Sequence, residues 1–484
     1  MTLKEKTVGS LIWSALENII RFGLNFIVGI ILARLLEPSE FGIIGLLTVF
    51  ISFSNLFIDS GFSQSLIRKK DCTSQDYSTV FIFNIIVSSI CYLILFLSAP
   101  HIAHFYEQPI LSQITRVYGI ILIFQSFALI QQTALVKKLD FKYLARVNVS
   151  ASFVAGIVAI FMAYRGFGVW SLVWQQLFRQ ALINVLLWSK QGWKVLFKFD
   201  YPLFKEHFNF GVKMLLSGLI YSISNNMYYL VIGKVFSAKE LGFFTRAEQF
   251  NNLPSKNFTG IISNVSYPVL SEIQDSQHGL VNAYKKLIQH STYIVFISMI
   301  GMAAMSKNMV LVLIGEKWLP SAEYVFIMCF ASMLYPLHAL NLNILKVKGR
   351  SDLFLKLEIV KQFIIVPTII LGAFLGIKIM LYVIVFNSYF GYYLNSYYSG
   401  RLISYGIFSQ VKDIYPNYLL AFAIGFFTYL AKFSFPENSH YALAAQLLSF
   451  VVSAILLSVI TKNGSFLYIV DILKDYKARI LRTG

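Results

Sequence analysis

A small set of ionisable side chains falls inside long apolar stretches of this 484-residue sequence. Arg179 stands near the middle of the stretch from Phe167 to Ser189, with Gln175 and Gln176 one turn before it. A charge surrounded by hydrocarbon costs several kcal/mol unless it is paired or hydrated. Two interpretations follow. Arg179 either lines a hydrated cavity, where it binds an anion, or forms a structural hydrogen bond to a neighbouring helix.

The first apolar stretch also carries charges. Glu17 and Arg21 are four residues apart, so on a helix they share a face with Asn25. One interpretation is an internal ion pair that merely neutralises both groups. The other makes Arg21 a cavity cation that Glu17 holds in place.

Further cations lie in apolar stretches of the second half of the chain. Lys213 stands near the start of one stretch, and its flexible side chain is expected to extend to the membrane surface. Lys356 is placed to reach the interface, whereas Lys361 lies deeper. Cations outnumber anions in these stretches, which favours an anionic substrate. The candidate binding cations are Arg21, Arg179, Lys213, Arg246, Lys256, Lys356 and Lys361, with Glu17, Asn25, Glu248 and Glu358 as supporting residues.

Metal, cofactor and nucleotide chemistry have no support in the sequence. Cys72, Cys91 and Cys329 lie far apart and form neither a CxxC pair nor a disulfide framework. No GxxxxGK phosphate loop occurs, so we expect no cofactor and no ATP hydrolysis by the chain itself. The lone His338, beside Pro336, is interpreted as a packing residue.

These residues must be positioned by membrane helices. The chain is 57% hydrophobic and only 13% charged, whereas a soluble domain is about 25% charged. A helix needs roughly 20 apolar residues to cross a bilayer. Six stretches of this length contain no Asp, Glu, Lys or Arg, which predicts an all-α polytopic membrane protein without a sizeable soluble domain: residues 79–98, 117–136, 214–233, 324–345, 379–399 and 441–461.

Hydropathy and loop signals together predict about fourteen transmembrane helices. The first is expected to stay as an anchor, because Lys4 and Lys6 lead into a stretch without a small-residue cleavage site. The predicted helices start near Val8, Phe41, Thr79, Val117, Val147, Phe167, Phe208, Leu241, Leu287, Tyr324, Leu353, Ile379, Asp413 and Tyr441.

Lys and Arg accumulate in alternate connections of this scheme, as they do on the cytoplasmic side of membrane proteins. The cluster Arg68, Lys69 and Lys70 is one example, whereas the other side carries mostly single cations such as Arg165. Both termini are therefore predicted to be cytoplasmic. The net charge of +18 follows largely from this face.

The chain contains one internal sequence repeat. Residues 31–42, ILARLLEPSEFG, align without gaps on residues 231–242, VIGKVFSAKELG, at an offset of 200 residues. Both turns follow the first helix of a predicted six-helix set, and six crossings return the chain to its starting side. The sets are therefore predicted to be parallel repeats about an axis along the membrane normal.

The repeat sets the predicted domains. Residues 1–200 and 201–400 form two six-helix lobes, and residues 401–484 form two additional transmembrane helices and a basic cytoplasmic tail. The repeat also assigns a membrane helix to residues 241–270, which hydropathy alone would reject. Because this segment is polar, we expect it to line a wet cavity.

Four segments carry a family resemblance that extends over essentially the whole chain. They are LARLLEPSEFG and DSGFSQSLIRKKD in the first ninety residues, and GEKWLPSAEYVF and LKVKGRSDLFLKLEIVKQ later. These segments resemble the Wzx-type polysaccharide and O-antigen flippases of the multidrug/oligosaccharidyl-lipid/polysaccharide (MOP) exporter superfamily.

The resemblance implies two six-helix lobes plus two helices, with alternating access to a central cavity. The implied substrate is an undecaprenyl-pyrophosphate-linked oligosaccharide, moved from the cytoplasmic to the periplasmic leaflet of a bacterial inner membrane for O-antigen, capsule or exopolysaccharide assembly. The implied partners are this lipid-linked glycan, the bilayer, and polysaccharide polymerase and assembly proteins, without nucleic acid. Cationic cavity residues are typical of such flippases, and by position they correspond to Arg21, Arg179, Arg246 and Lys256.

Three other functions remain open at this stage. A cation-coupled multidrug or small-molecule antiporter would need cavity carboxylates, and each available one lies close to a cation. A membrane glycosyltransferase or polymerase would need a carboxylate on a large external loop, but the longest external connection, residues 100–115, holds only Glu107. A non-transporting scaffold would place polar residues at helix ends rather than in the interior.

Overall fold

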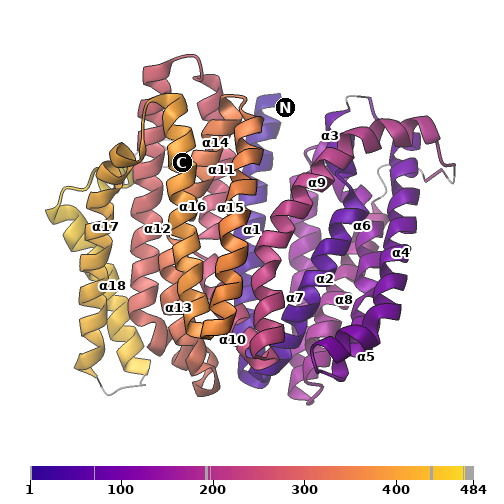
Figure 1. The fold of residues 1–484 in the computed structure, drawn as a ribbon, viewed down its shortest axis with the longest axis horizontal. Helices are drawn as coiled ribbons and strands as arrows, with labels where there is room; N and C mark the ends of the chain where they lie inside the picture. The colour runs from indigo at the N-terminus through magenta and orange to yellow at the C-terminus, as the bar shows by residue number, and fades with distance from the viewer. Residues whose placement is uncertain are drawn as a thin grey trace, which may run out of the picture. The chain divides into compact units, whose positions relative to one another are not determined.

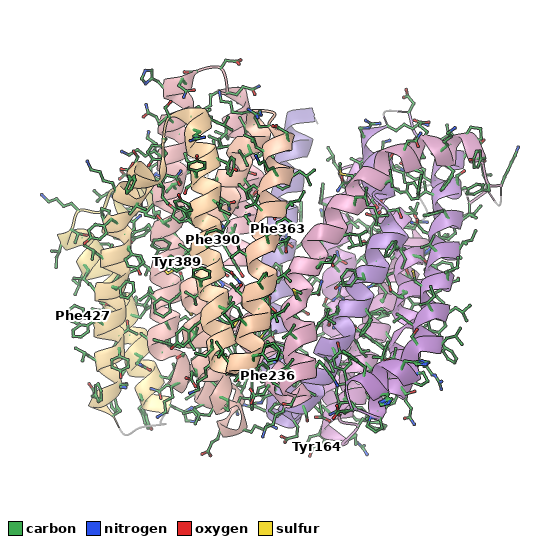
Figure 2. All side chains as sticks on the ribbon, viewed as in Figure 1. Tyr164, Phe236, Phe363, Tyr389, Phe390 and Phe427 are labelled. Atoms are coloured by element: carbon green, nitrogen blue, oxygen red, sulfur yellow. The ribbon has the colours of Figure 1, made fainter. Side chains whose placement is uncertain are left out.

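In the computed structural model of the chain, every regular element among the described residues is helical (Figure 1). The structure describes residues 3–69, 71–190, 195–196, 198–435, 440–471 and 474. Within these residues, 11 helical segments are long and apolar enough to cross a membrane. The prediction of an all-α polytopic membrane protein is therefore confirmed. Phe363 and Phe427, labelled in Figure 2, are two of many exposed large apolar side chains, as expected of helices that face lipid.

The chain divides into two compact units, and the first comprises Met1–Thr245. In it, α7 packs between α1 and α8, α6 packs against α4 and α8, and α2 packs against α9. Its helices are α1 (Leu3–Leu35), α2 (Pro38–Asp59), α3 (Phe62–Arg68), α4 (Ser74–Phe105), α5 (Ile110–Tyr118), α6 (Ile120–Lys137), α7 (Phe141–Tyr164), α8 (Val169–Ser189) and α9 (Tyr201–Val231), with a π-helical turn at Ile232–Phe236 and the start of α10 (Ala238–Asn252).

The second unit comprises Arg246–Gly484. The long α12 packs along α17 and α13, α15 packs against α16, and α18 packs against α17. Its helices are the end of α10, α11 (Lys256–Glu272), α12 (Gln277–Ile314), α13 (Leu319–Ser332), α14 (Tyr335–Val347), α15 (Ser351–Leu375), α16 (Ile377–Ile403), α17 (Ile407–Leu430) and α18 (His440–Ile460), with short 3₁₀ turns at Glu316–Trp318 and Ala431–Ser434.

The two compact units are defined by contacts between residues, whereas the two lobes are predicted from the sequence repeat. The contacts group α9 with the first unit, although the repeat makes it the first helix of the second lobe. The lobe boundaries at residues 200 and 400 therefore remain predictions.

Two predicted spans are broken near their middle into two helices, and both breaks lie beside a proline. Residues 241–270, predicted as one helix, are interrupted between α10 and α11 by a turn that contains Pro254. Residues 324–345 are interrupted between α13 and α14, next to Pro336. Proline lacks a backbone N–H and clashes with the preceding turn of a helix, so it favours a new helix start over a continuous helix.

The two copies of the repeated turn contact each other reciprocally within the first unit. A Cβ atom on Gly42 would lie 1.6 Å from the carbonyl oxygen of Ala238, and a Cβ atom on Gly242 would lie 1.8 Å from that of Pro38. Pro38 and Gly42 align on Ala238 and Gly242 in the repeat, so each contact is the image of the other. A reciprocal contact of this kind is the signature of a two-fold axis. The geometry therefore supports the predicted repeat.

Candidate functional site

A cavity of about 610 Å³ lies inside the first unit, with walls from α1, α2, α3, α6, α7, α8 and α9. We call it the arginine cavity. Its polar lining is unusually rich for the interior of a helical bundle and consists of four charged side chains and six amides: Glu17, Arg21, Asp59, Arg179, Asn55, Gln64, Gln125, Gln132, Asn148 and Gln180.

The predicted pair on α1 is present and faces this cavity. Nε of Arg21 lies 3.8 Å from Oε1 of Glu17, and Nδ2 of Asn148, on α7, donates to the same oxygen at 2.7 Å. Nη2 of Arg21 also donates to Asn18 at 2.9 Å, and the guanidinium lies over the ring of Phe22. The carboxylate therefore orients Arg21 at the cavity wall, and Asn148 orients the carboxylate.

Arg179 projects into the cavity from the middle of α8. Among the described residues it has neither a hydrogen-bond nor an ion-pair partner. The charge that affects it most is the positive charge of Arg21, which repels it. The structural hydrogen bond offered by one of the two interpretations is therefore not found. The five N–H donors of this guanidinium remain available to water or to a bound anion.

Asp59 is a cavity carboxylate that the sequence interpretation missed. Its Oδ1 accepts from the backbone N–H of Ser63 at 3.1 Å and from the hydroxyl of Ser63 at 2.6 Å. With Glu17 it balances the two arginines, so the predicted excess of cations is not found among the lining residues. The carboxylates and Arg179 nevertheless differ in their hydrogen-bond partners. Both carboxylates accept hydrogen bonds from the protein, whereas Arg179 donates none to any described residue.

The six amides were also missed, although a signal for them exists in the sequence. Gln125 and Gln132 are seven residues apart on α6, and Asn55 and Asp59 are four apart on α2, so each pair shares one helix face. The sequence interpretation weighed only charged groups. Polar residues at helical spacing inside apolar helices would have identified this wall.

Two of the predicted residues in the first unit are not placed at the cavity. Asn25 lies on α1 but does not line the arginine cavity. Lys213 lies on α9, and its side chain is outside the part of the chain that the structure describes. Their assigned roles remain predictions.

The predicted residues of α10 and α11 form local contacts in the second unit. Nζ of Lys256 lies 3.0 Å from Oε1 of Glu248, and Nη1 of Arg246 donates to Gln249. Lys256 also lies over the ring of Tyr335. These contacts hold the cations in place, and the assignment to substrate binding stays a prediction.

The predicted residues of α15 differ in depth, as expected. Lys361 is buried and donates to Glu358 at 2.7 Å, whereas Lys356 is exposed. The prediction that His338 is a packing residue agrees with its two hydrogen bonds, to Asn395 at 2.9 Å and to Ser388 at 3.2 Å.

Two relatives of this chain are named for the biosynthesis of teichuronic acid and of lipopolysaccharide. The chain is 24% identical to the teichuronic acid biosynthesis protein TuaB of Bacillus subtilis (strain 168), over 89% of this chain and 88% of that protein. It is 23% identical to the lipopolysaccharide biosynthesis protein WzxC of Escherichia coli (strain K12), over 77% of this chain and 76% of that protein.

Solved transporter structures share the fold. The lipid II flippase MurJ in its inward-closed conformation superposes with a TM-score of 0.72 at 12% identity, over 95% of this chain and 98% of that one. An inward-facing multidrug resistance MATE family transporter of the MOP superfamily gives 0.56 at 14% identity, over 92% and 99%. The chain thus has the fold of these two solved transporters, as the resemblance implied.

A family model described as "Polysaccharide biosynthesis protein" matches residues 31–323, which is more than half of the sequence. The match begins at the first copy of the repeated turn and extends through α12. Together with the relatives and the fold, it shows that this multi-pass membrane protein belongs to the polysaccharide biosynthesis protein family.

Proposed function

We propose that this protein is a flippase that moves an undecaprenyl-pyrophosphate-linked oligosaccharide from the cytoplasmic to the periplasmic leaflet of a bacterial inner membrane. The observation that carries the proposal is the guanidinium of Arg179. It projects from the middle of α8 into a polar cavity and has no protein partner among the described residues. Membership of the polysaccharide biosynthesis protein family supports this class of substrate over others.

The chemistry of the cavity suits a diphosphate that carries sugars. Such a headgroup cannot enter hydrocarbon unaided, because each unsatisfied polar group costs several kcal/mol. A guanidinium donates two parallel hydrogen bonds to phosphate oxygens. The amides of Gln125, Gln132 and Gln180 both donate and accept, so they match the hydroxyl groups of a sugar.

The volume of the cavity limits what it holds. About 610 Å³ is within the range of small-molecule sites, which suffices for a diphosphate and the first sugar rings. A prenyl chain of undecaprenyl length does not fit there as well. We infer that the chain stays in lipid while the headgroup crosses by alternating access, with both termini of the protein on the cytoplasmic side.

A cation-coupled antiporter is the second candidate, and the carboxylates of Glu17 and Asp59 in the cavity wall favour it. A cation site needs carboxylate oxygens that are free to coordinate. Here, Glu17 accepts from Asn148 and pairs with Arg21, and Asp59 accepts twice from Ser63. These contacts make the flippase the better fit.

The first test is export of surface polysaccharide in a strain that lacks this protein. The strain is complemented with wild type, Arg179→Ala, Arg179→Lys or Arg165→Ala, each at equal membrane abundance. Arg165→Ala is the matched control, because Arg165 is an exposed arginine at the end of α7 that contacts the ring of Phe161. The measurements are the amount of lipid-linked oligosaccharide and the leaflet in which it resides.

The deletion strain should accumulate lipid-linked oligosaccharide in the cytoplasmic leaflet. Wild type and Arg165→Ala should relieve the accumulation. Arg179→Ala should reduce export at least tenfold, and Arg179→Lys should restore it only in part because an ammonium is not bidentate. Normal lipid intermediates in the deletion strain, with no redundant carrier, would exclude the flippase and favour the antiporter.

A further inference from the structure

A second cavity, of about 1050 Å³, lies wholly inside the second unit. It is bounded by the first half of α12, the first half of α17 and the turn that follows α18. We call it the lysine cavity. It shares no residue with the arginine cavity and has no part in the proposed substrate path.

Two lysines give one end of this cavity a positive charge. Lys286 extends from α12, and Lys462 lies in the turn after α18. Among the described residues neither lysine has a carboxylate partner. Asp413 also lines the cavity, but its carboxylate is already engaged by Nζ of Lys285 at 2.8 Å and by the hydroxyl of Tyr405 at 2.5 Å. The charges of Lys286 and Lys462 are thus uncompensated.

A hydrogen-bonded framework holds the polar end in shape. Asn463 donates to Oδ1 of Asn417 at 2.9 Å, and Asn417 donates to the carbonyl of Gln289 at 2.8 Å. The ring of His290 stacks on that of Tyr468, with centroids 4.5 Å apart and planes 6° from parallel. A wall whose side chains are already fixed loses little conformational entropy when it binds a ligand.

The deeper part of the cavity is apolar. Leu420 and Ala423 follow Asn417 along α17, and Leu457 precedes the turn after α18. Lys462 lies just after the end of α18, and Lys286 lies in the first third of α12. The aliphatic side chains lie one to two turns beyond Asn417 on α17 and in the last turn of α18. A cavity of this build is matched to an amphiphile with an anionic head and an aliphatic chain.

We propose that the lysine cavity binds one anionic phospholipid. Its phosphate lies between Lys286 and Lys462, and an acyl chain lies along Leu420, Ala423 and Leu457. The lipid is a bound ligand of the second unit rather than the transported molecule. The uncompensated pair of lysines selects an anionic headgroup over a zwitterionic one, whose cationic group they repel.

The test measures lipid binding to the purified full-length protein by native mass spectrometry, with phosphatidylglycerol and phosphatidylcholine as the probes. Wild type is compared with the double variant Lys286→Gln/Lys462→Gln and with Ala423→Trp, which fills the apolar part without a change in charge. The matched control is Lys346→Gln/Lys412→Gln, which removes the same two charges from the second unit at positions outside the cavity. Gel filtration and thermal unfolding verify that each variant is folded.

Wild type should retain one phosphatidylglycerol and bind it at least tenfold more tightly than phosphatidylcholine. The lysine double variant should lose that preference, Ala423→Trp should bind less of both lipids, and the control should behave as wild type. Equal binding of the two lipids by wild type, or an unchanged preference in the lysine double variant, would overturn the proposal. Neither result bears on Arg179 or on export, so the two proposals fail independently.

Discussion

At the residue scale, the charged groups of this protein differ chiefly in whether the protein itself satisfies them. Arg21 pairs with Glu17, and Lys361 pairs with Glu358, so these groups are held in defined positions. Arg179 has no such partner among the described residues. A partly buried cation without a partner makes the folded state less stable, and a bound anion would offset that cost. This difference separates a binding residue from a residue that fixes the wall.

A buried network near the start of α4 contains a charged group that the protein itself satisfies. Asp76 is 1% exposed and lies 2.8 Å from Nζ of Lys69 and 3.1 Å from Nε2 of His207. Nδ1 of His207 lies 2.8 Å from the hydroxyl of Ser65, and the backbone N–H and hydroxyl of Thr73 also donate to Asp76. The network joins α3, α4 and α9 within the first unit.

Replacing Lys69 with Gln should therefore destabilise the protein. The buried carboxylate of Asp76 would lose its ionic partner, which costs about 3 kcal/mol or more for a fully buried pair. Thr73 and His207 would still donate to it, and Lys69 is partly exposed, so we expect a loss of about 1 to 3 kcal/mol. Thermal unfolding in detergent measures the change. A melting temperature equal to that of wild type would show that the pair does not stabilise the network.

Glu206→Gln is the matched control, because Glu206 contacts the same Nζ at 2.9 Å but is 53% exposed. An exposed pair contributes only about 0 to 1 kcal/mol. Burial opposes the charged form of Lys69, but its hydrogen bonds to Asp76 and Glu206 outweigh this effect and raise the pKa of Lys69 above 10.5. A raised lysine pKa stabilises the folded state below 10.5 and loses that contribution as the pH rises through the folded value. The difference between wild type and Lys69→Gln should therefore persist at neutral pH and shrink above pH 10.5.

The sequence identified three of the four charged residues that line the arginine cavity and none of its six amides. Arg21 and Arg179 stand out because a charge in an apolar stretch requires a physical explanation. Gln125 and Asn148 do not stand out, since single amides are common in membrane helices as packing residues. Helical spacing marks Gln125 and Gln132 as one face of α6, but which helix faces meet at one cavity depends on how α1, α6 and α7 pack, and no local pattern encodes that.

At the scale of elements, the close approach of α2 and α10 depends on two glycines. Gly42 and Gly242 each face a backbone carbonyl at a distance that leaves no room for a side chain. The carbonyls belong to Ala238 and Pro38, which are themselves equivalent positions of the repeat. The repeated turn is therefore shaped to fit its own copy, and this fit explains why both copies have glycine at the same place.

Gly42→Ala should consequently strain the protein even though alanine favours helices. The added methyl group would lie 1.6 Å from a backbone oxygen, so the helices must separate. Forced overpacking costs about 1 to 3 kcal/mol. Gly242→Ala should cost a similar amount, because Gly242 makes the equivalent contact with Pro38. Thermal unfolding is the measurement, with polysaccharide export as a second readout.

Gly23→Ala in α1 is the control for helix propensity, since a Cβ atom there would meet nothing within 4 Å. It should be neutral or stabilising by up to about 1 kcal/mol. If both Gly42→Ala and Gly242→Ala matched Gly23→Ala in stability, the helices would not be in close contact and the two-fold interpretation of the repeat would be wrong.

Helices were easier to predict than their interruptions. The predicted starts near Tyr324 and Leu241 fall on helices, but each predicted span is broken next to a proline. Pro100 and Pro268, by contrast, lie inside α4 and α11 without ending them. Whether a proline kinks or breaks a helix depends on the neighbours that satisfy the freed carbonyl groups, so the local sequence does not decide it.

At the scale of the whole molecule, the number of crossings depends on three helical segments that are less apolar than the others. The 11 apolar segments do not include α8, α9 or the pair α10 and α11. The predicted fourteen helices include all three. A polar helix crosses a membrane only when other helices shield it from lipid, and hydropathy alone does not detect such shielding. The internal repeat predicts a crossing for one of the three segments, because the start of α10 aligns with the start of the apolar α2.

Fourteen and eleven crossings predict opposite topologies for the second half of the chain, and labelling of single cysteines distinguishes them. Arg350 and Lys378 flank α15 and are both exposed. With fourteen crossings and a cytoplasmic N-terminus, position 350 follows the tenth helix and is cytoplasmic, whereas position 378 follows the eleventh and is periplasmic. With eleven crossings the two assignments exchange, because removal of three crossings reverses the parity of every later connection.

The experiment places Arg350→Cys or Lys378→Cys in a background without Cys72, Cys91 and Cys329 and labels intact spheroplasts with a membrane-impermeant maleimide. Glu107→Cys is the internal control, since it follows the third helix and is periplasmic under either count. We expect labelling at positions 107 and 378, and none at 350 until the membrane is permeabilised. The basic turn around Arg350 independently favours the cytoplasmic side. Labelling at 350 in place of 378 would mean that one of the three segments, or all three of them, does not cross, and the prediction of fourteen crossings would then be wrong.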